Sequence, residues 1–215
     1  ILIFAEEIEI QFDGGIAYIP QINEQDDLSN IRIVYNDGYT FYGRGTENGY
    51  PLEGDYENQQ LQIFYSGKFD ENEAFTGYGE LETPTFHYVG EFLNGKKNGY
   101  GTLFNKNTNL IYEGEFLNDE RSGEGTEYIE GSLYTYKGSW LKNQKNGFGE
   151  IITNEGTSYI GYFENGEIKG EGIKTNSNGD IIKGVWINND LPSGESCSYI
   201  GQNGQKYYGE IVNGK

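Results

Sequence analysis

The sequence has no methionine, one cysteine (Cys197) and one histidine (His87). It has no run of 18 apolar residues, so no transmembrane helix is expected. The apolar start, Ile1 to Ala5, is too short for the core of a signal peptide. A single cysteine cannot form an intramolecular disulfide, which fits a reducing, intracellular compartment. Because methionine is absent, we expect Ile1 not to be the initiating residue and the chain to be a piece of a longer protein.

Long aliphatic stretches are missing as well. The hydrophobic fraction is 35%, and 19 Tyr, 12 Phe and 2 Trp supply much of it. Buried parallel strands need continuous Val, Ile and Leu, so the composition argues against a doubly wound or TIM-type enzyme. The 33 glycines follow no three-residue period, which excludes collagen. The wealth of aromatic residues argues against disorder, so we expect the chain to fold.

Basic residues are scarce. Lys and Arg number 15 against 34 Asp and Glu, which gives a net charge of −19. Residues 1–95 alone hold 3 basic and 18 acidic side chains. An acidic surface repels phosphate backbones and anionic lipid headgroups. We therefore expect no nucleic-acid ligand, we disfavour membrane attachment, and we expect a basic partner at the acidic N-terminal part.

One five-residue pattern, aromatic-x-Gly-x-aromatic, recurs along the chain. Its first positions, here called anchors, stand at 41, 65, 88, 112, 136, 159, 182 and 207, so the spacing is 23 to 25 residues. A Gly-x-Gly pair follows the middle anchors by 11 or 12 residues. The aromatic and glycine positions of the pattern define an expected repeat spine: Tyr65, Gly67, Phe69, Tyr88, Gly90, Phe92, Tyr112, Gly114, Phe116, Tyr136, Gly138, Trp140, Tyr159, Gly161, Phe163, Gly184, Trp186, Tyr207 and Gly209.

Each period reads as strand, turn, strand, turn, which predicts one β-hairpin per repeat. Asn, Asp and Gly tolerate the positive φ of tight hairpin turns. Such residues separate the halves of the repeats at Asn94-Gly95, Asn118-Asp119, Asn165-Gly166 and Asn188-Asn189. Positions i, i+2 and i+4 of the anchor strand share one face, and the bare glycine leaves a slot for a ring from a neighbouring strand or unit. We predict an all-β fold: an elongated, single-layer antiparallel sheet of stacked hairpins, twisted into a rod or ribbon.

The pattern resembles the MORN repeat, whose consensus is Tyr-x-Gly-x-Trp/Phe, a turn and Gly-x-Gly. The resemblance is strong over residues 65–186, continues to Lys215 and weakens over 18–64, with departures such as Gly45 and Ile182. We therefore expect a MORN array over 41–215 and divergent hairpins over 1–40 that serve as a cap, with a degenerate repeat at 18–40. The resemblance implies arrays that mediate protein contact and self-association, as in ciliary radial-spoke heads and cytoskeletal rings. Some such arrays were proposed to bind phospholipids.

No catalytic, cofactor or metal site is expected. The segment 90–97 approaches a phosphate-binding loop but lacks the hydroxyl residue and the following helix. The segment 176–180 shares a few letters with a calcium loop but lacks its closing Glu. His87 has no second histidine or cysteine near it in sequence, so it is interpreted as a strand residue before Tyr88. Cys197 is interpreted as a small strand residue.

Four aromatic residues outside the spine would add surface for a partner. If they are exposed in a row, they form a groove for a peptide or helix: Tyr78, Tyr100, Phe148 and Tyr162. An open strand edge at each end of the array favours end-to-end association of copies. The chain ends at Gly214-Lys215, inside an anchor hairpin, so we expect further sequence beyond it.

The leading hypothesis is a non-catalytic scaffold that binds other proteins of a large assembly. We expect that assembly to be ciliary and radial-spoke-head-like, or otherwise cytoskeletal, with the axoneme as its location. Two alternatives stay open. One is a membrane- or phospholipid-associated tether, and the other is a regulatory array next to an enzyme domain outside this chain. The tether would rely on a group of lysines: Lys96, Lys97, Lys106, Lys142 and Lys145.

Overall fold

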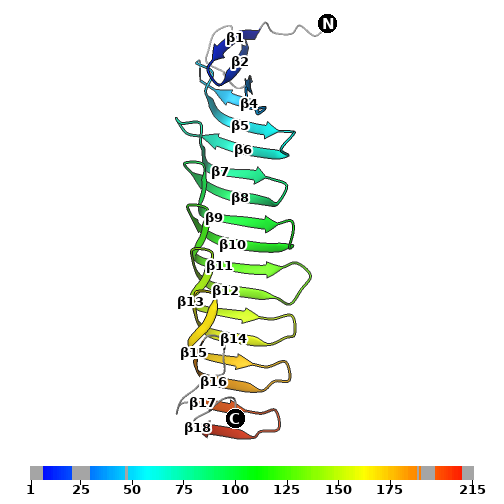
Figure 1. The fold of residues 1–215 in the computed structure, drawn as a ribbon, viewed down its shortest axis with the longest axis vertical. Helices are drawn as coiled ribbons and strands as arrows, with labels where there is room; N and C mark the ends of the chain where they lie inside the picture. The colour runs from blue at the N-terminus through cyan, green and yellow to red at the C-terminus, as the bar shows by residue number, and fades with distance from the viewer. Residues whose placement is uncertain (1–6, 21–29, 47, 188, 190–196, 210–215) are drawn as a thin grey trace. The chain divides into compact units, whose positions relative to one another are not determined.

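The computed structural model describes residues 7–20, 30–46, 48–187, 189 and 197–209 (Figure 1). Two compact units divide the chain, Ile1–Asn107 and Thr108–Lys215. The regular elements of the described residues are all β-strands; they contain no helix, and so none long and apolar enough to cross a membrane. The all-β fold of stacked antiparallel hairpins predicted from the repeat is confirmed. The domain boundary expected between residues 40 and 41 stays a prediction.

In the first unit each strand pairs antiparallel with the next one along the chain (Figure 1). Part of the degenerate repeat expected over 18–40, residues 21–29, lies outside the described residues. The strands are β1 (Glu7–Phe12), β2 (Gly15–Pro20), β3 (Ile31–Tyr35), β4 (Thr40–Gly45), β5 (Pro51–Asn58), β6 (Ile63–Phe69), β7 (Phe75–Glu82), β8 (Phe86–Leu93) and β9 (Lys96–Asn105).

The second unit follows the same rule of antiparallel pairing between consecutive strands (Figure 1). The chain end at Gly214-Lys215 lies outside the described residues. The strands are β10 (Leu110–Leu117), β11 (Glu120–Ile129), β12 (Thr135–Leu141), β13 (Gln144–Ile152), β14 (Ser158–Glu164), β15 (Glu167–Thr175), β16 (Ile181–Trp186), β17 (Cys197–Ile200) and β18 (Lys206–Gly209).

Two-residue turns join four of the anchor strands, β8, β10, β12 and β14, to the strands that follow them. Positive φ at both turn residues, the geometry of a type I′ hairpin turn, occurs at three predicted turns: Asn94–Gly95, Asn118–Asp119 and Asn165–Gly166. A further turn of this kind, Lys142–Asn143, has φ of 49° and 66°. The sequence did not predict it, because lysine has no local means of stabilising positive φ. Of the predicted turn at Asn188–Asn189, Asn188 lies outside the described residues and Asn189 has φ of 65°.

The anchor strands alternate between a buried and an exposed face. In β8, Tyr88, Gly90 and Phe92 are buried, whereas Glu91 and Leu93 are exposed. The repeated aromatic positions make up most of the core: Phe41, Tyr65, Phe69, Tyr88, Phe92, Tyr112, Phe116, Tyr136, Trp140, Tyr159, Phe163 and Trp186. The last spine positions differ, because Tyr207 is 46% exposed and Gly209 is half-buried. Among the described strands β18 pairs with β17 alone, so less of the chain covers this end of the spine.

Where the anchor is an aromatic residue, its ring fills the glycine slot of its own strand. A Cβ on Gly90 would lie 2.5 Å from the hydroxyl of Tyr88, and a Cβ on Gly101 of β9 would meet the same ring. A bulge between Gly90 and Phe92 breaks the ladder at this point. The Tyr88 ring therefore lies over Gly90 of its own strand and over Gly101 of the paired strand, β9. This corrects the expectation that a neighbouring ring fills the anchor strand's slot.

The second aromatic of each pattern links successive repeats within a unit. The ring of Trp140 stands edge-on to Tyr136 of its own strand and to Tyr112 of the preceding repeat, with 5.2 Å between ring centroids in both pairs. Edge-on aromatic pairs add about 0.5–1.5 kcal/mol beyond the area they bury. The same link joins Phe163 to Tyr136, Trp186 to Tyr159 and Phe92 to Tyr65.

Candidate interaction surface and side-chain clusters

The sheet face opposite the spine carries two rows of side chains separated by glycine backbone. The glycines pair strand to strand, as Gly161 does with Gly149 and Gly172. In the second unit this arrangement leaves a groove of about 540 Å³ across β13, β14, β15 and β16. Gly161, Gly172 and Gly184 line it, together with side chains of the two flanking rows. We refer to it as the β13–β16 groove.

The side chains that border the β13–β16 groove are mostly apolar. Phe148 and Tyr162 are in cross-strand register, and their exposed rings stand edge-on with centroids 5.5 Å apart. Their exposed fractions are 52% and 50%, whereas the rings of the spine at Tyr159 and Phe163 are buried. The remaining lining side chains are Ile160, Glu171, Ile173, Lys183 and Val185. Large exposed apolar surfaces mark interaction sites in folded proteins.

The other two residues of the expected groove lie in the first unit. Tyr78 of β7 and Tyr100 of β9 are 68% and 57% exposed. Tyr78 is in register with Glu91 of β8, and Glu91 accepts a hydrogen bond of 3.0 Å from the main-chain N–H of Tyr100. The structure thus brings Phe148 and Tyr162 together, and it places Tyr78 and Tyr100 beside a carboxylate.

A buried polar cluster in the second unit was not found from the sequence. Glu127 of β11 is 6% exposed and lies across from the anchor tyrosines of β10 and β12. Its carboxylate pairs with Arg121 and, at 3.3 Å, with Lys145, and it accepts a hydrogen bond of 2.5 Å from the Tyr134 hydroxyl. The sequence holds one signal that could have revealed this cluster. Glu127 is a carboxylate at a position of β11 whose side chain lies on the same face as the aromatic spine.

The electrostatics of this cluster favour the ionised form of Glu127. Burial alone would raise the pKa of the carboxyl, but the hydrogen bond from Tyr134 and the charges of Lys145 and Arg121 more than offset it and lower the pKa. Burial, reinforced by Glu127, raises the pKa of the Tyr134 hydroxyl well above its ordinary value. The cluster is therefore a charged pairing site at neutral pH, and Arg121 also lies 4.2 Å from the centre of the Trp140 ring.

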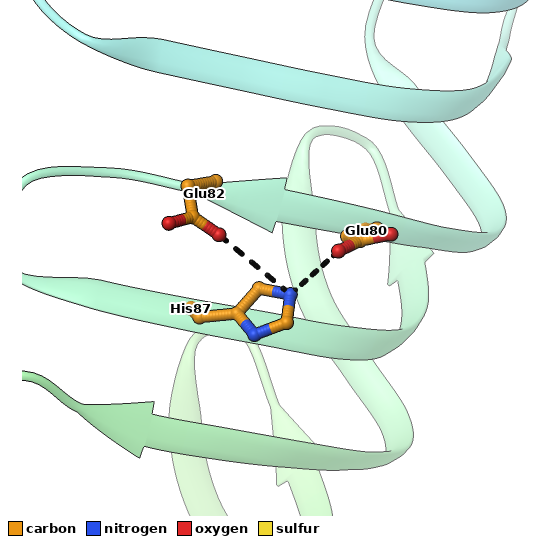
Figure 2. Close-up of side chains that lie close together, drawn as sticks. All are labelled: Glu80, Glu82 and His87. Atoms are coloured by element: carbon orange, nitrogen blue, oxygen red, sulfur yellow. Dashed lines mark hydrogen bonds and ion pairs between the residues drawn. The ribbon is translucent and has the colours of Figure 1, made fainter. Parts of the chain in front are cut away.

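A second cluster, of Glu80, Glu82 and His87, occupies the exposed face of the β7–β8 hairpin (Figure 2). The Nε2 atom of His87 lies 2.7 Å from a carboxylate oxygen of Glu80 and 3.9 Å from one of Glu82. The other oxygen of Glu82 pairs with the Lys106 ammonium at 2.6 Å. This hydrogen bond is the main reason that the pKa of Glu82 is lowered.

Comparison with family models identifies MORN repeats. The MORN repeat model matches residues 88–108, 112–131, 136–158 and 159–181. Three of the matches begin at an anchor tyrosine of the second unit, and the first begins at Tyr88. The chain thus carries four MORN repeats, which identify a repeat-type module of protein interaction or membrane association.

Other comparisons find only remote likeness. No curated protein matches the chain. Among solved structures, the SAS-4 (dCPAP) TCP domain of Drosophila melanogaster, in complex with a proline-rich motif of Ana2 (dSTIL), is 11% identical. The match covers 90% of this chain and 99% of that one, with a TM-score of 0.44.

Proposed function

We propose that the chain is a non-catalytic scaffold whose MORN repeats bind other proteins, with the β13–β16 groove as a docking site for a peptide or helix. The observation that carries the proposal is the exposed ring pair of Phe148 and Tyr162 beside glycine backbone. Aromatic residues dominate the energy of protein interfaces when a partner excludes water from them. The bare glycines let a partner approach the sheet between the two side-chain rows.

The proposed setting is a cytoskeletal assembly, in particular a ciliary array like that of a radial-spoke head. The excess of acidic side chains over residues 1–95, 18 against 3 basic ones, favours a basic partner at that part. Charge of one sign steers such a partner and makes its binding sensitive to salt. Repeats of this kind also leave strand edges that can pair with a second copy.

The second candidate is a membrane-associated tether, which the MORN repeats themselves allow. Its weakness lies in the lysines that would contact anionic lipid. Lys106 pairs with Glu82, and Lys145 pairs with Glu127, so these two cations are already held by carboxylates. Each free basic residue adds only about 1 kcal/mol of attraction to an anionic membrane. We therefore rank the protein-binding scaffold first.

The test is fractionation of the native cells with non-ionic detergent, followed by a salt wash of the pellet. The scaffold proposal expects the chain in the detergent-resistant pellet and its release by salt. A chain with Phe148→Ser and Tyr162→Ser should leave the pellet without a salt wash. Tyr208→Ser is the matched control, because this ring is exposed but does not line the groove. Release of the native chain by detergent alone would instead favour the membrane tether.

A further inference from the structure

We propose that Glu80, Glu82 and His87 form a binding site for a zinc ion on the β7–β8 hairpin. The ligand atoms of the three side chains all lie within 4.8 Å of one another. Figure 2 shows both carboxylates turned toward the imidazole across the hairpin. Among the described residues this is the one group of three His, Cys, Asp or Glu side chains that meets this spacing.

The strand register builds the site. Glu82 and His87 are directly opposite each other in the β7–β8 ladder, and Glu80 lies two residues before Glu82 on the same face. Side chains two apart on a strand share a face, and opposite side chains are close neighbours. The sequence suggested no metal site because His87 has no second histidine or cysteine near it. The two carboxylates come close to the His87 imidazole only when β7 pairs with β8.

The distances suit zinc after a small adjustment. Zinc takes imidazole nitrogen and carboxylate oxygen at about 2.1 Å, so the ligand atoms of a tetrahedral site lie about 3.4 Å apart. The His87 to Glu80 separation, 2.7 Å, must widen, and the His87 to Glu82 separation, 3.9 Å, must close. The three side chains are between 33% and 48% exposed, so they have room to move. A mixed imidazole and carboxylate set favours zinc over calcium or magnesium, which prefer oxygen ligands alone.

Lys106 shapes the site and also weakens it. Its ammonium donates to one oxygen of Glu82 and, at 2.7 Å, to the main-chain carbonyl of Thr83. This leaves the second oxygen of Glu82 facing His87. The same positive charge repels a cation bound a few ångströms away. Replacing the ammonium with a neutral group should therefore tighten zinc binding.

The experiment titrates zinc chloride into the whole chain, freed of any histidine tag. Because His87 is the only histidine, one set of imidazole signals in a proton–nitrogen NMR spectrum reports directly on the site. We expect its Nε2 signal to shift and to saturate at one equivalent, with matching stoichiometry by calorimetry. Glu80→Gln and Glu82→Gln should each weaken the affinity at least tenfold, and Lys106→Gln should strengthen it severalfold. Glu53→Gln is the control, an exposed carboxylate of the same unit that pairs with Arg44.

Surface carboxylates of so acidic a chain will bind some zinc. The His87 signals and the Glu53→Gln control distinguish that binding from binding at the proposed site. Far-UV circular dichroism confirms that each variant keeps its β structure. The proposal is overturned if one equivalent of zinc leaves the His87 signals unchanged, or if His87→Gln binds zinc as tightly as the native chain. It is also overturned if Glu53→Gln loses as much affinity as Glu80→Gln. A Lys106→Gln chain with unimproved affinity contradicts Glu82 as a ligand.

Discussion

The hydroxyl of Tyr136 donates a hydrogen bond of 2.9 Å to the main-chain carbonyl of Ser139, three residues later in the same strand. To reach it, the ring lies over Gly138 and over Gly149 of the paired strand. The same bond recurs at other anchors, from Tyr65 to Lys68, Tyr88 to Glu91, Tyr112 to Glu115 and Tyr159 to Tyr162. In these five anchor strands the hydroxyl bond occurs together with a bulge just after the anchor.

The first prediction concerns the space between the Tyr136 ring and the glycine backbone below it. A Cβ on Gly149 would lie 2.6 Å from the Tyr136 hydroxyl, so Gly149→Ala must displace a buried ring. Overpacking of this kind costs about 1–3 kcal/mol, and a lost hydrogen bond adds about 1 kcal/mol. We expect Gly149→Ala to lower the free energy of unfolding by about 3 kcal/mol in urea denaturation.

Gly156→Ala is the control for this prediction. A Cβ there meets nothing within 4 Å, although φ is +76°. Gly156→Ala should lower the free energy of unfolding only by the cost of holding an alanine at positive φ, about 1 kcal/mol. Gly149 itself does not have a positive φ. A loss at Gly149→Ala no larger than that at Gly156→Ala would therefore contradict the expected cost of displacing the Tyr136 ring.

The second prediction concerns the Tyr136 hydroxyl and separates its contribution from that of the ring. Tyr136→Phe keeps the ring and leaves the carbonyl of Ser139 without this donor, so the free energy of unfolding should fall by about 1 kcal/mol. Burial raises the pKa of the Tyr136 hydroxyl above its ordinary value, so the group stays protonated and able to donate in alkaline buffers. Tyr162→Phe, on the exposed face, should change thermal stability little. A stability of Tyr136→Phe equal to that of the native chain would show that the bond adds nothing net.

The spine was accessible to sequence reasoning because its pattern is local. Tyr88, Gly90 and Phe92 stand two apart, and a strand puts such residues on one face whatever surrounds it. The position of the Tyr88 ring was not accessible in the same way, because a bulge, which strand periodicity does not encode, directs it. Tyr207 shows a second limit of sequence reasoning. It fits the spine pattern but is exposed, because exposure at the end of an array depends on which strands cover it.

The clusters show why sites are harder to predict than strands. Glu82 and His87 are five residues apart, and only the register of the hairpin makes them neighbours. Glu127 takes its partners from three different segments, at Arg121, Tyr134 and Lys145. Contacts of this kind depend on side-chain reach across paired strands, which composition and spacing do not specify. Of the four expected groove residues, Phe148 and Tyr162 meet because they are opposite each other in the ladder.

The third prediction concerns the turn that the sequence did not reveal. Lys142 has φ of 49°, a conformation that costs most residues other than Gly, Asn and Asp about 1–2 kcal/mol. Lys142→Asn should therefore raise the free energy of unfolding by up to about 1 kcal/mol. The reverse change at a matched turn, Asn118→Lys, should lower it by a similar amount, because Asn118 has φ of 51°. Denaturation midpoints that move in the same direction for both variants would contradict this explanation.

The last prediction is the pH dependence that Glu127 gives to folding. Burial opposes ionisation of this carboxyl, but Tyr134, Lys145 and Arg121 together lower its pKa below the ordinary value of 4.5. A group whose pKa is lower in the folded state stabilises the fold above its unfolded pKa, and the stabilisation is lost as pH falls through the folded pKa. Glu127→Gln leaves two partly buried cations without their counter-ion, so we expect it to lower the free energy of unfolding by about 3 kcal/mol at pH 7.

The native chain should lose this advantage as the solution is acidified below about pH 4.5, where an unfolded glutamate is more than half protonated. The difference between native and Glu127→Gln midpoints, measured by urea denaturation from pH 7 to pH 3, should therefore shrink. Glu130→Gln is the matched control, since this residue is exposed three positions further along the chain. It should follow the native profile throughout. A constant gap between the native and Glu127→Gln profiles would show that the carboxylate contributes through packing and hydrogen bonding rather than through its charge.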